Sequence, residues 1–260
     1  MKIVVLVKQV PDTEQERRLD PATRLLDRGA GESVMDEINE RALEVALRRK
    51  DSDKKGTEVV ALTMGPEPAA QALRKALSMG ADSAVHIRDN ALAGADAATT
   101  ARVLAAALRR TGFDLVIAGN ESTDGGGGIV PAMVAEHLGL PLLGALNSAA
   151  IADGAVSGEC AAEGAQLSVR AALPALVSVT ERAAEARFPN FKGIMTAKRK
   201  PLETLSLAEL GLDGATVSTG GRTAVLTAAE RPPRAAGRKI IDEGQAGAEL
   251  AEFLLAERLV

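Results

Sequence analysis

The sequence predicts an α/β protein with a doubly wound, mostly parallel sheet and an extended arm at its C-terminal end. In the first 140 residues, apolar runs of strand length alternate with amphipathic runs of helix length, and the apolar runs are continuous. Continuous apolar runs are typical of parallel strands that are covered on both faces. After Pro232 and Pro233 the chain is polar until a last short amphipathic stretch, which favours an arm over a further domain.

The elements of the first half follow from local patterns. Strands are expected where β-branched residues, leucine and alanine form short runs, at residues 3–7, 58–63, 84–87 and 114–118. Helices are expected where apolar positions recur every three to four residues, at residues 36–50, 67–78 and 95–110 and in a stretch ending near residue 137. Asp36 is expected to cap the first helix, whose end is rich in arginine, as the helix dipole favours.

The second half changes in character after Pro141. Strands are expected at residues 155–161, 166–171 and 175–180, and a glycine-containing turn suited to a hairpin joins the first two. Residues 181–201 form a basic stretch with little periodicity, and residues 248–259 are expected to form a short amphipathic helix. We therefore expect one α/β domain over residues 1–200 and an arm over residues 201–260 that has little reason to pack on its own core.

Composition excludes several function classes. The single cysteine, Cys160, gives no disulfide framework or cysteine metal cluster, and His86 and His137 are too few and too far apart for a histidine metal site. The net charge of −4 and the 2% aromatic content argue against a nucleic-acid partner. The opening apolar run is broken at Lys8, and no run reaches the roughly 20 residues of a spanning helix, so we expect a cytoplasmic protein without membrane insertion.

A candidate ligand site follows from the sheet. Open α/β sheets bind ligands at the carboxyl ends of their strands, where the loops at residues 7–12, 64–66 and 119–128 and the loop after residue 87 should meet. The third of these contains four consecutive glycines before a predicted helix, so its backbone N–H groups are expected to approach a phosphate without a Cβ in the way. The loop has neither a Walker motif nor a GxGxxG fingerprint.

The polar residues of the glycine loop are given different roles. Asn120, Ser122 and Thr123 are expected to offer further hydrogen bonds, whereas Asp124 would repel a phosphate and is assigned to bracing the loop or to a ribose hydroxyl. Elsewhere we find no nucleophile–base pair, and Glu40 and Glu44 are expected to be solvated on one helix face.

The remaining single residues are interpreted as structural: His86 as a satisfied core residue, His137 at a helix end and Cys160 as a small buried apolar residue. The residues alone thus predict a nucleotide-binding α/β domain whose chemistry stays open.

Five stretches add a resemblance, in order along the chain: KIVVLVKQVPDT (residues 2–13), MDEINERALEVALR (35–48), LTMGPEPAAQALRKALSMGAD (62–82), DLVIAGNESTDGGGGIVPAMVAEHLGLP (114–141) and ALPALVSVTERAAEARFPNFKGIMTAKRKPLE (172–203). Together these blocks resemble the β subunits of electron-transfer flavoproteins, the ETF β or FixA family. The resemblance implies a Rossmann-like fold of the adenine nucleotide alpha hydrolase type and a heterodimer with an ETF α subunit that holds most of the FAD.

The resemblance also implies that this chain binds AMP as a structural ligand and has no catalytic residues. Carried over by position, the AMP contacts fall on strand-end residues, on the start of the first helix and on the glycine loop: Leu6, Asp36, Glu37, Ile38, Asn39, Met64, Gly119, Asn120, Glu121, Ser122, Thr123, Asp124, Gly125, Gly126, Gly127, Gly128, Ile129 and Val130. The family's flavin-facing aromatic positions are Thr13 and Ile38 here, so any flavin contact from this chain is expected to be polar or aliphatic.

Electron relay is the implied function, from flavin dehydrogenases such as the acyl-CoA dehydrogenases of fatty acid β-oxidation, through FAD, to a quinone oxidoreductase or other acceptor. The partner-recognition loop would be residues 181–200, with these docking residues: Phe191 as the apolar anchor, Lys192, Ile194, Met195, Lys198, Arg199 and Lys200. The arm over residues 201–260 would wrap the α subunit.

Three alternatives stay open. In a bifurcating member of the family, a second FAD replaces AMP in this site. An ATP-using enzyme on the same scaffold would turn the nucleotide over, and a regulatory nucleotide sensor would exchange it reversibly.

Overall fold

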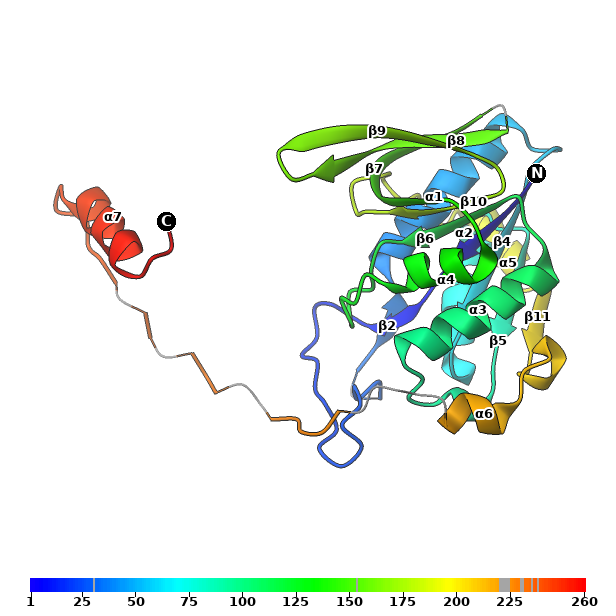
Figure 1. The fold of residues 1–260 in the computed structure, drawn as a ribbon, viewed down its shortest axis with the longest axis horizontal. Coiled ribbons are helices and arrows are strands. Elements are labelled where there is room, and N and C mark those ends of the chain that lie inside the picture. The colour runs from blue at the N-terminus through cyan, green and yellow to red at the C-terminus, as the bar shows by residue number, and fades with distance from the viewer. Residues whose placement is uncertain (30, 153, 220–224, 230–231, 235, 238) are drawn as a thin grey trace. The chain divides into compact units, whose positions relative to one another are not determined.

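The continuous apolar runs of the sequence form the centre of one large sheet (Figure 1). The computed structural model describes residues 1–260 except residues 30, 153, 220–224, 230–231, 235 and 238. The chain divides into two units, Met1–Leu226 and Thr227–Val260, which are described separately.

The first unit contains a nine-stranded sheet in the order β11-β5-β4-β1-β6-β10-β7-β8-β9. All pairings from β11 to β7 are parallel, and β8 and β9 extend the sheet as an antiparallel hairpin. Its strands are β1 (Lys2–Leu6), β4 (Glu58–Met64), β5 (Ser83–Ile87), β6 (Leu115–Gly119), β7 (Leu142–Ala152), β8 (Ala155–Ala162), β9 (Ala165–Ala172), β10 (Ala175–Val179) and β11 (Leu202–Leu205). A second sheet pairs β2 (Gln9–Pro11) with β3 (Ser33–Met35).

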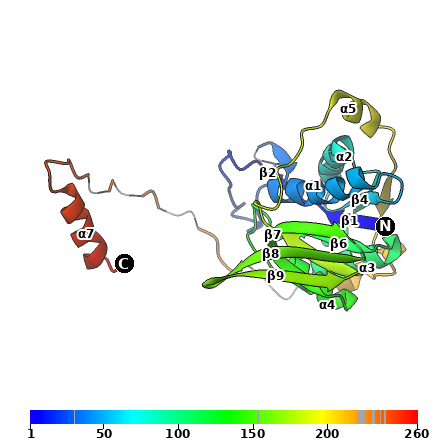
Figure 2. The same ribbon diagram turned by 90° about the horizontal axis from the view of Figure 1, so that it is seen from above.

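Helices cover both faces of the central strands, as the continuous apolar runs require. They are α1 (Glu37–Ser52), α2 (Ala70–Met79), α3 (Ala97–Thr111), α4 (Val130–Leu138), α5 (Phe191–Ala197) and α6 (Gly214–Thr219), with short 3₁₀ turns η1 (Glu67–Ala69), η2 (Asn90–Leu92) and η3 (Ala208–Leu210). Figure 2 shows α1, α2 and α5 on one side of the sheet and α3 and α4 on the other.

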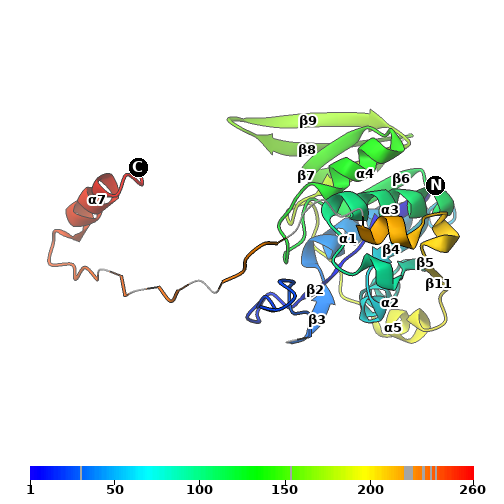
Figure 3. The same cartoon turned by 60° about the horizontal axis from the view of Figure 1, so that its bottom comes forward.

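The core is divided by the sheet because successive residues of a strand point to opposite faces. Ile3 and Val5 of β1 pack in the cluster that contains the leucines of α1 and α2. Val4 and Leu6 pack in the second cluster, with the apolar residues of α3 and α4. Figure 3 shows these two helices side by side. The predicted doubly wound α/β fold is therefore confirmed, and the four strands predicted in the first half are present within one or two residues.

Several elements were not anticipated from the sequence. The long strand β7 was missed, and the basic stretch 181–201 contains the helix α5. Residues beyond 200 also join the first unit: β11 pairs with β5, and Leu207 and Val217 are buried in the core beside α3. The division therefore falls after Leu226 rather than at residue 200.

The second unit contains the helix α7 (Ala246–Ala256), close to the predicted helix at residues 248–259 (Figure 1). None of the residues of α7 is buried, and Leu250, Phe253 and Leu255 are exposed. Within the described ranges, no helix is both long and apolar enough to cross a membrane.

Candidate functional site

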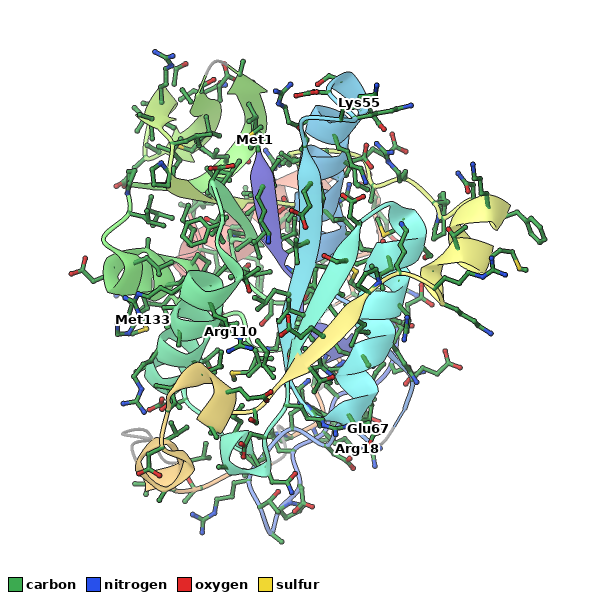
Figure 4. The ribbon with its side chains drawn as sticks, turned by 90° about the vertical axis from the view of Figure 1, so that its right-hand side faces the viewer. Met1, Arg18, Lys55, Glu67, Arg110 and Met133 are labelled. Atoms are coloured by element: carbon green, nitrogen blue, oxygen red, sulfur yellow. The ribbon has the colours of Figure 1, made fainter. Side chains whose placement is uncertain are left out.

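The topological switch point of the sheet lies between β1 and β6. From β1 the chain proceeds through α1 to β4 on one side, whereas β6 lies on the other side of β1 and is reached from β5 through α3. The loops that follow β1 and β6 therefore diverge at the carboxyl edge and leave room for a ligand. Figure 4 shows Arg18 and Glu67 together at this end of the strands, and Met1 and Lys55 at the opposite end.

Asp36 joins these two loops. Its side chain is fully buried, and Oδ1 accepts a hydrogen bond from the backbone N–H of Ile38 at 3.0 Å, which caps α1 as predicted. Oδ2 accepts from both the backbone N–H and the hydroxyl of Thr123, at 2.7 and 2.9 Å. The start of α1 is thereby fixed to the loop after β6.

Gly119 lies where α1 passes closest to β6. A Cβ at this position would lie 2.6 Å from Nδ2 of Asn39 and 3.0 Å from Cγ2 of Ile38. Asn39 is itself held, because its Oδ1 accepts a hydrogen bond from the backbone N–H of Lys8 at 2.7 Å. Gly119 is therefore needed for the packing of α1, which differs from the phosphate-approach role expected for the glycines further along the loop.

Replacing Gly119 with alanine is expected to lower the free energy of unfolding by about 1–3 kcal/mol, the usual cost of overpacking a filled site. Gly127 provides the matched control, because a Cβ there would meet nothing within 4 Å. Gly127→Ala should change the free energy of unfolding by less than about 1 kcal/mol. Urea unfolding of both variants measures the difference, and equal stabilities would contradict the close approach of α1.

The glycine run itself is open. Gly125, Gly126, Gly127 and Gly128 are all exposed, and φ is +57° at Gly126 and +62° at Gly128, a conformation that favours glycine. The helix α4 begins directly afterwards, and its N-cap residue Ile129 supplies no side-chain hydrogen bond.

The first turn of α4 offers hydrogen-bond donors beside this run. The N–H groups in the first turn of a helix have no intrahelical partner. Pro131 has no N–H, so the free donors of this turn are those of Val130 and Ala132. Such donors, together with the positive end of the helix dipole, favour an anion.

Cations from the loop after β1 surround the residues that precede the glycines. Lys8 Nζ lies 2.7 Å from Oδ1 of Asp124, and Arg28 Nη2 lies 2.7 Å from its Oδ2. Lys8 Nζ also donates to the Ser122 hydroxyl at 3.1 Å, and Arg17 donates to the Thr123 carbonyl. Sequence reasoning missed these three cations, since the loop has no motif that marks them.

Asp124 has the bracing role suggested from the sequence. Its side chain is 1% exposed, and this burial opposes ionisation. The hydrogen bond and charge of Lys8, with hydrogen bonds from Ser122 and Arg28, outweigh burial and hold the pKa of Asp124 well below its usual value. The carboxylate is thus permanently charged near neutral pH and is occupied by two cations.

Two buried amide atoms in these loops lack a hydrogen-bond partner among the described residues: Oδ1 of Asn120 and Nε2 of Gln9. Unpaired buried polar atoms are rare in folded proteins, and a ligand is one of the groups that satisfies them. Asn120 was expected from the sequence, whereas Gln9 was not.

The other residues expected at the site lie at the same edge with differing exposure. Leu6 and Met64 end their strands, Glu37 and Glu121 are exposed, and Val130 is half-buried. The two positions discussed for flavin contact differ from each other: Thr13 is exposed, and Ile38 is buried against Gly119.

The second predicted region, residues 181–200, presents an apolar surface on α5. Asn190 caps the helix by accepting a hydrogen bond from the Gly193 N–H at 2.7 Å. Phe191 is 80% exposed, and Ile194 and Met195 are also exposed. Phe188, which sequence reasoning did not select, is 94% exposed. We call Phe188, Phe191, Ile194 and Met195 the α5 apolar patch.

The basic residues around the α5 apolar patch divide into two groups. Lys192, Lys198 and Arg199 are exposed, as expected for a charged rim. Lys200 is half-buried instead, and its Nζ donates to the carbonyl oxygens of Leu77 and Ala81 at 2.8 and 2.6 Å. Lys200 therefore differs from the three exposed residues, because it satisfies carbonyls at the end of α2, where a cation is favoured.

Three single residues, His86, His137 and Cys160, were interpreted from the sequence as structural. His86 is 2% exposed, and its Nε2 lies 3.0 Å from the Gly65 carbonyl oxygen, which confirms a satisfied core residue. Burial lowers the pKa of His86, so the ring is neutral at pH 7. His137 lies in the last turn of α4, as expected. Cys160 lies in β8 but is only partly buried.

The interpretation of Glu40 and Glu44 as solvated is wrong. Glu44 is 5% exposed and pairs with Arg187, and Glu40 pairs with Lys75 of α2. Glu44 also pairs with Arg48 at the i,i+4 position, but Arg187 and Lys75 are distant in sequence from the glutamates they contact, so the local pattern did not indicate them.

Comparison with known proteins identifies the family of this chain. The family described as "Electron transfer flavoprotein domain" matches residues 23–210. The electron transfer flavoprotein subunit beta of Mycobacterium tuberculosis is 48% identical over 264 residues, and that of Mycobacterium leprae is 47% identical, with 99% of each chain covered in both cases. The subunit CarD of the caffeyl-CoA reductase-Etf complex of Acetobacterium woodii is 32% identical over 93% of this chain and 92% of its own. The chain therefore belongs to the electron transfer flavoprotein family, as one of its β subunits.

Proposed function

We propose that this β subunit binds AMP at the carboxyl edge of its sheet and holds it as a structural ligand. The observation that carries the proposal is the open glycine run, Gly125 to Gly128, placed at the start of α4 and beside the switch point. Backbone N–H groups of this run and of the first turn of α4 would bind the phosphate. The unpaired amides of Asn120 and Gln9 are suited to the polar edge of the base or to the ribose.

The same residues favour holding the nucleotide over converting it. Asp124 is the acidic side chain next to the glycines, and its two oxygens are occupied by Lys8 and Arg28. A carboxylate whose pKa is held low by two cations is a poor proton acceptor, so it is not suited to activate water or a hydroxyl group. This chain is therefore suited to bind and orient the nucleotide.

The wider function is electron relay in a heterodimer with an ETF α subunit. FAD, held mainly by the α subunit, would supply the redox chemistry. A flavin dehydrogenase, such as an acyl-CoA dehydrogenase, would dock at the α5 apolar patch, and a quinone oxidoreductase or other acceptor would receive the electrons. An exposed apolar group within the charged rim of Lys192, Lys198 and Arg199 has the anatomy of a small hot spot with electrostatic steering.

The second unit, Thr227–Val260, is proposed to wrap the α subunit. The apolar residues of α7, including Leu250 and Leu255, are exposed within it, and a partner surface would remove them from water.

Nucleotide analysis of the purified heterodimer tests the proposal. After denaturation, we expect FAD and AMP in equal amounts. Two FAD per heterodimer without AMP would assign this site to a second flavin, and steady ATP hydrolysis by the heterodimer would assign it to an enzyme. Gly127→Ala adds a sharper test, because the new Cβ should reduce retained AMP while leaving the FAD content unchanged and changing the free energy of unfolding of the nucleotide-free protein by less than about 1 kcal/mol.

A further inference from the structure

An ion-pair cluster connects Arg187, which directly precedes the α5 apolar patch, to Glu44 and Asp51 of α1. Arg187 Nε lies 2.6 Å from Oε2 of Glu44, and its Nη2 lies 3.0 Å from Oε1, so the guanidinium binds the carboxylate with two parallel hydrogen bonds. The same Nη2 lies 2.8 Å from Oδ2 of Asp51, and the backbone N–H of Arg187 donates to Glu44 at 3.3 Å. Two-pronged pairing fixes the direction of an arginine side chain as well as its position.

The cluster lies on a single stripe of α1. Arg41, Glu44, Arg48 and Asp51 are spaced by three or four residues and so share one face of the helix. From this stripe, Arg41 also donates to the backbone carbonyl of Ala184 at 2.8 Å. The chain is therefore held at residues 184 and 187, immediately before the α5 apolar patch.

The far end of the patch is held by α2. Arg74 donates to the Ala197 carbonyl at 3.1 Å, and Lys200 donates to two carbonyls at the end of α2. A Cβ on Gly193 would clash with the backbone carbonyl of Ser78, which shows how closely α5 approaches α2. Phe188 and Phe191 lie between these two attachments, with their rings exposed.

Leaving the buried charge of Glu44 with fewer partners would destabilise the folded protein. Glu44 is 5% exposed and also accepts a hydrogen bond from Arg48 Nε at 3.2 Å, so loss of Arg187 would leave this buried carboxylate with one cation that is itself exposed. The hydrogen bond to Glu44 raises the pKa of Arg187 further above its usual value. The guanidinium of Arg187 therefore stays charged near neutral pH.

We propose that Arg187 is a positioning residue for partner docking: paired with Glu44 of α1, it fixes the direction in which Phe188 and Phe191 are presented to a dehydrogenase. The role rests on the proposed docking function of the α5 apolar patch. Arg187 does not touch the partner; it acts through the backbone it holds. Pre-ordering an exposed segment lowers the entropy that its partner must remove on binding.

The test uses the full heterodimer with four variants: Arg187→Gln, Glu44→Gln, the double variant and Arg187→Lys. The matched control is Arg182→Gln, which removes a charge from the same stretch, where Arg182 pairs only weakly with its neighbour Glu181 at 3.6 Å. Hydrogen exchange of residues 184–191 and the rate of electron transfer from an acyl-CoA dehydrogenase reduced by acyl-CoA are measured for each heterodimer.

We expect Arg187→Gln and Glu44→Gln each to accelerate exchange in residues 184–191 and to lower the second-order transfer rate about 10-fold. The loss should appear in KM for the flavoprotein, with kcat, FAD content and reoxidation by a small dye unchanged. The double variant should lose less than the sum of the two single variants, because both remove the Arg187–Glu44 pair, although Arg187→Gln also removes the contact with Asp51. Arg187→Lys should recover part of the rate, and Arg182→Gln should match the wild type.

The outcomes separate this inference from the docking proposal. Unchanged exchange in Arg187→Gln would overturn the positioning role. Faster exchange with an unchanged rate, where Phe191→Ala still slows transfer, would also overturn it and leave docking intact. If neither Arg187→Gln nor Phe191→Ala slows electron transfer, the docking proposal itself fails. The hydrogen exchange data would then still show whether Arg187 orders residues 184–191. If Arg182→Gln lowers the second-order transfer rate as much as Arg187→Gln does, the effect is general charge steering, and the positioning role is overturned.

Discussion

Replacing Phe191 with alanine is expected to lower the second-order rate constant for electron transfer from a reduced acyl-CoA dehydrogenase by about 30-fold. Truncation of a central aromatic hot spot typically costs at least about 2 kcal/mol of binding free energy, which corresponds to this factor. Phe191 is 80% exposed and belongs to neither core cluster, so the free energy of unfolding and the FAD and AMP contents should not change. Stopped-flow measurement at several dehydrogenase concentrations gives the rate constant.

Leu167 provides a control for loss of exposed apolar surface. It lies in β9, away from α5 in the sequence and on a different element, and it is 46% exposed. Leu167→Ala should transfer electrons at the wild-type rate. A Phe191→Ala heterodimer that is as fast as the Leu167→Ala heterodimer would show that the α5 apolar patch is not where the dehydrogenase binds.

Asp36→Ala is expected to lower the free energy of unfolding by about 2–4 kcal/mol and to remove bound AMP. The change leaves three hydrogen-bond donors without their acceptor: the Ile38 N–H and the N–H and hydroxyl of Thr123. Loss of an N-cap costs about 0.5–2 kcal/mol, and unsatisfied buried donors add about 1–3 kcal/mol each in unfavourable cases. The loop that carries the glycines would also lose its attachment to α1. Urea unfolding and nucleotide analysis of the same preparation measure both effects.

Asp96→Ala is the matched control, since Asp96 caps α3 by accepting a hydrogen bond from the Thr99 N–H at 2.8 Å. It should lose about 1 kcal/mol, the typical value of a cap, and retain AMP. If both variants retain AMP equally, the attachment of the glycine loop to α1 has no part in nucleotide binding.

The parallel core of the fold could be predicted because its strands are marked locally. The runs that form β1, β4 and β6 are continuous and apolar, and such runs are buried wherever they occur in an α/β chain. By contrast, β7 contains glycine and alanine, with Ala145 at a positive φ of 51°, and β11 exists because it pairs with β5. Their structure depends on neighbours distant in sequence, which no local pattern reports.

Some features of the candidate site could likewise be predicted from the sequence, and others could not. The glycine run and the cap of α1 by Asp36 are visible as short motifs, and both are in place. The cations are not: Lys8 and Arg28 reach Asp124 across separations of 116 and 96 residues. A single arginine or lysine in a polar loop has no distinguishing neighbour in sequence, so its role is evident only once the loop is folded over its target.

The attachment of the docking region to α1 limits how this protein can be redesigned. If the proposed docking role of the α5 apolar patch holds, residues 184–200 are the segment to exchange between β subunits in order to change the dehydrogenase they serve. In a host whose α1 lacks carboxylates at the positions of Glu44 and Asp51, however, that stretch would leave Arg187 without the partners it has here. A working chimera would have to carry the matching stripe of α1 as well. Because Asp36, the cap of α1, is hydrogen-bonded to the loop after β6, such a graft would extend into the proposed nucleotide site.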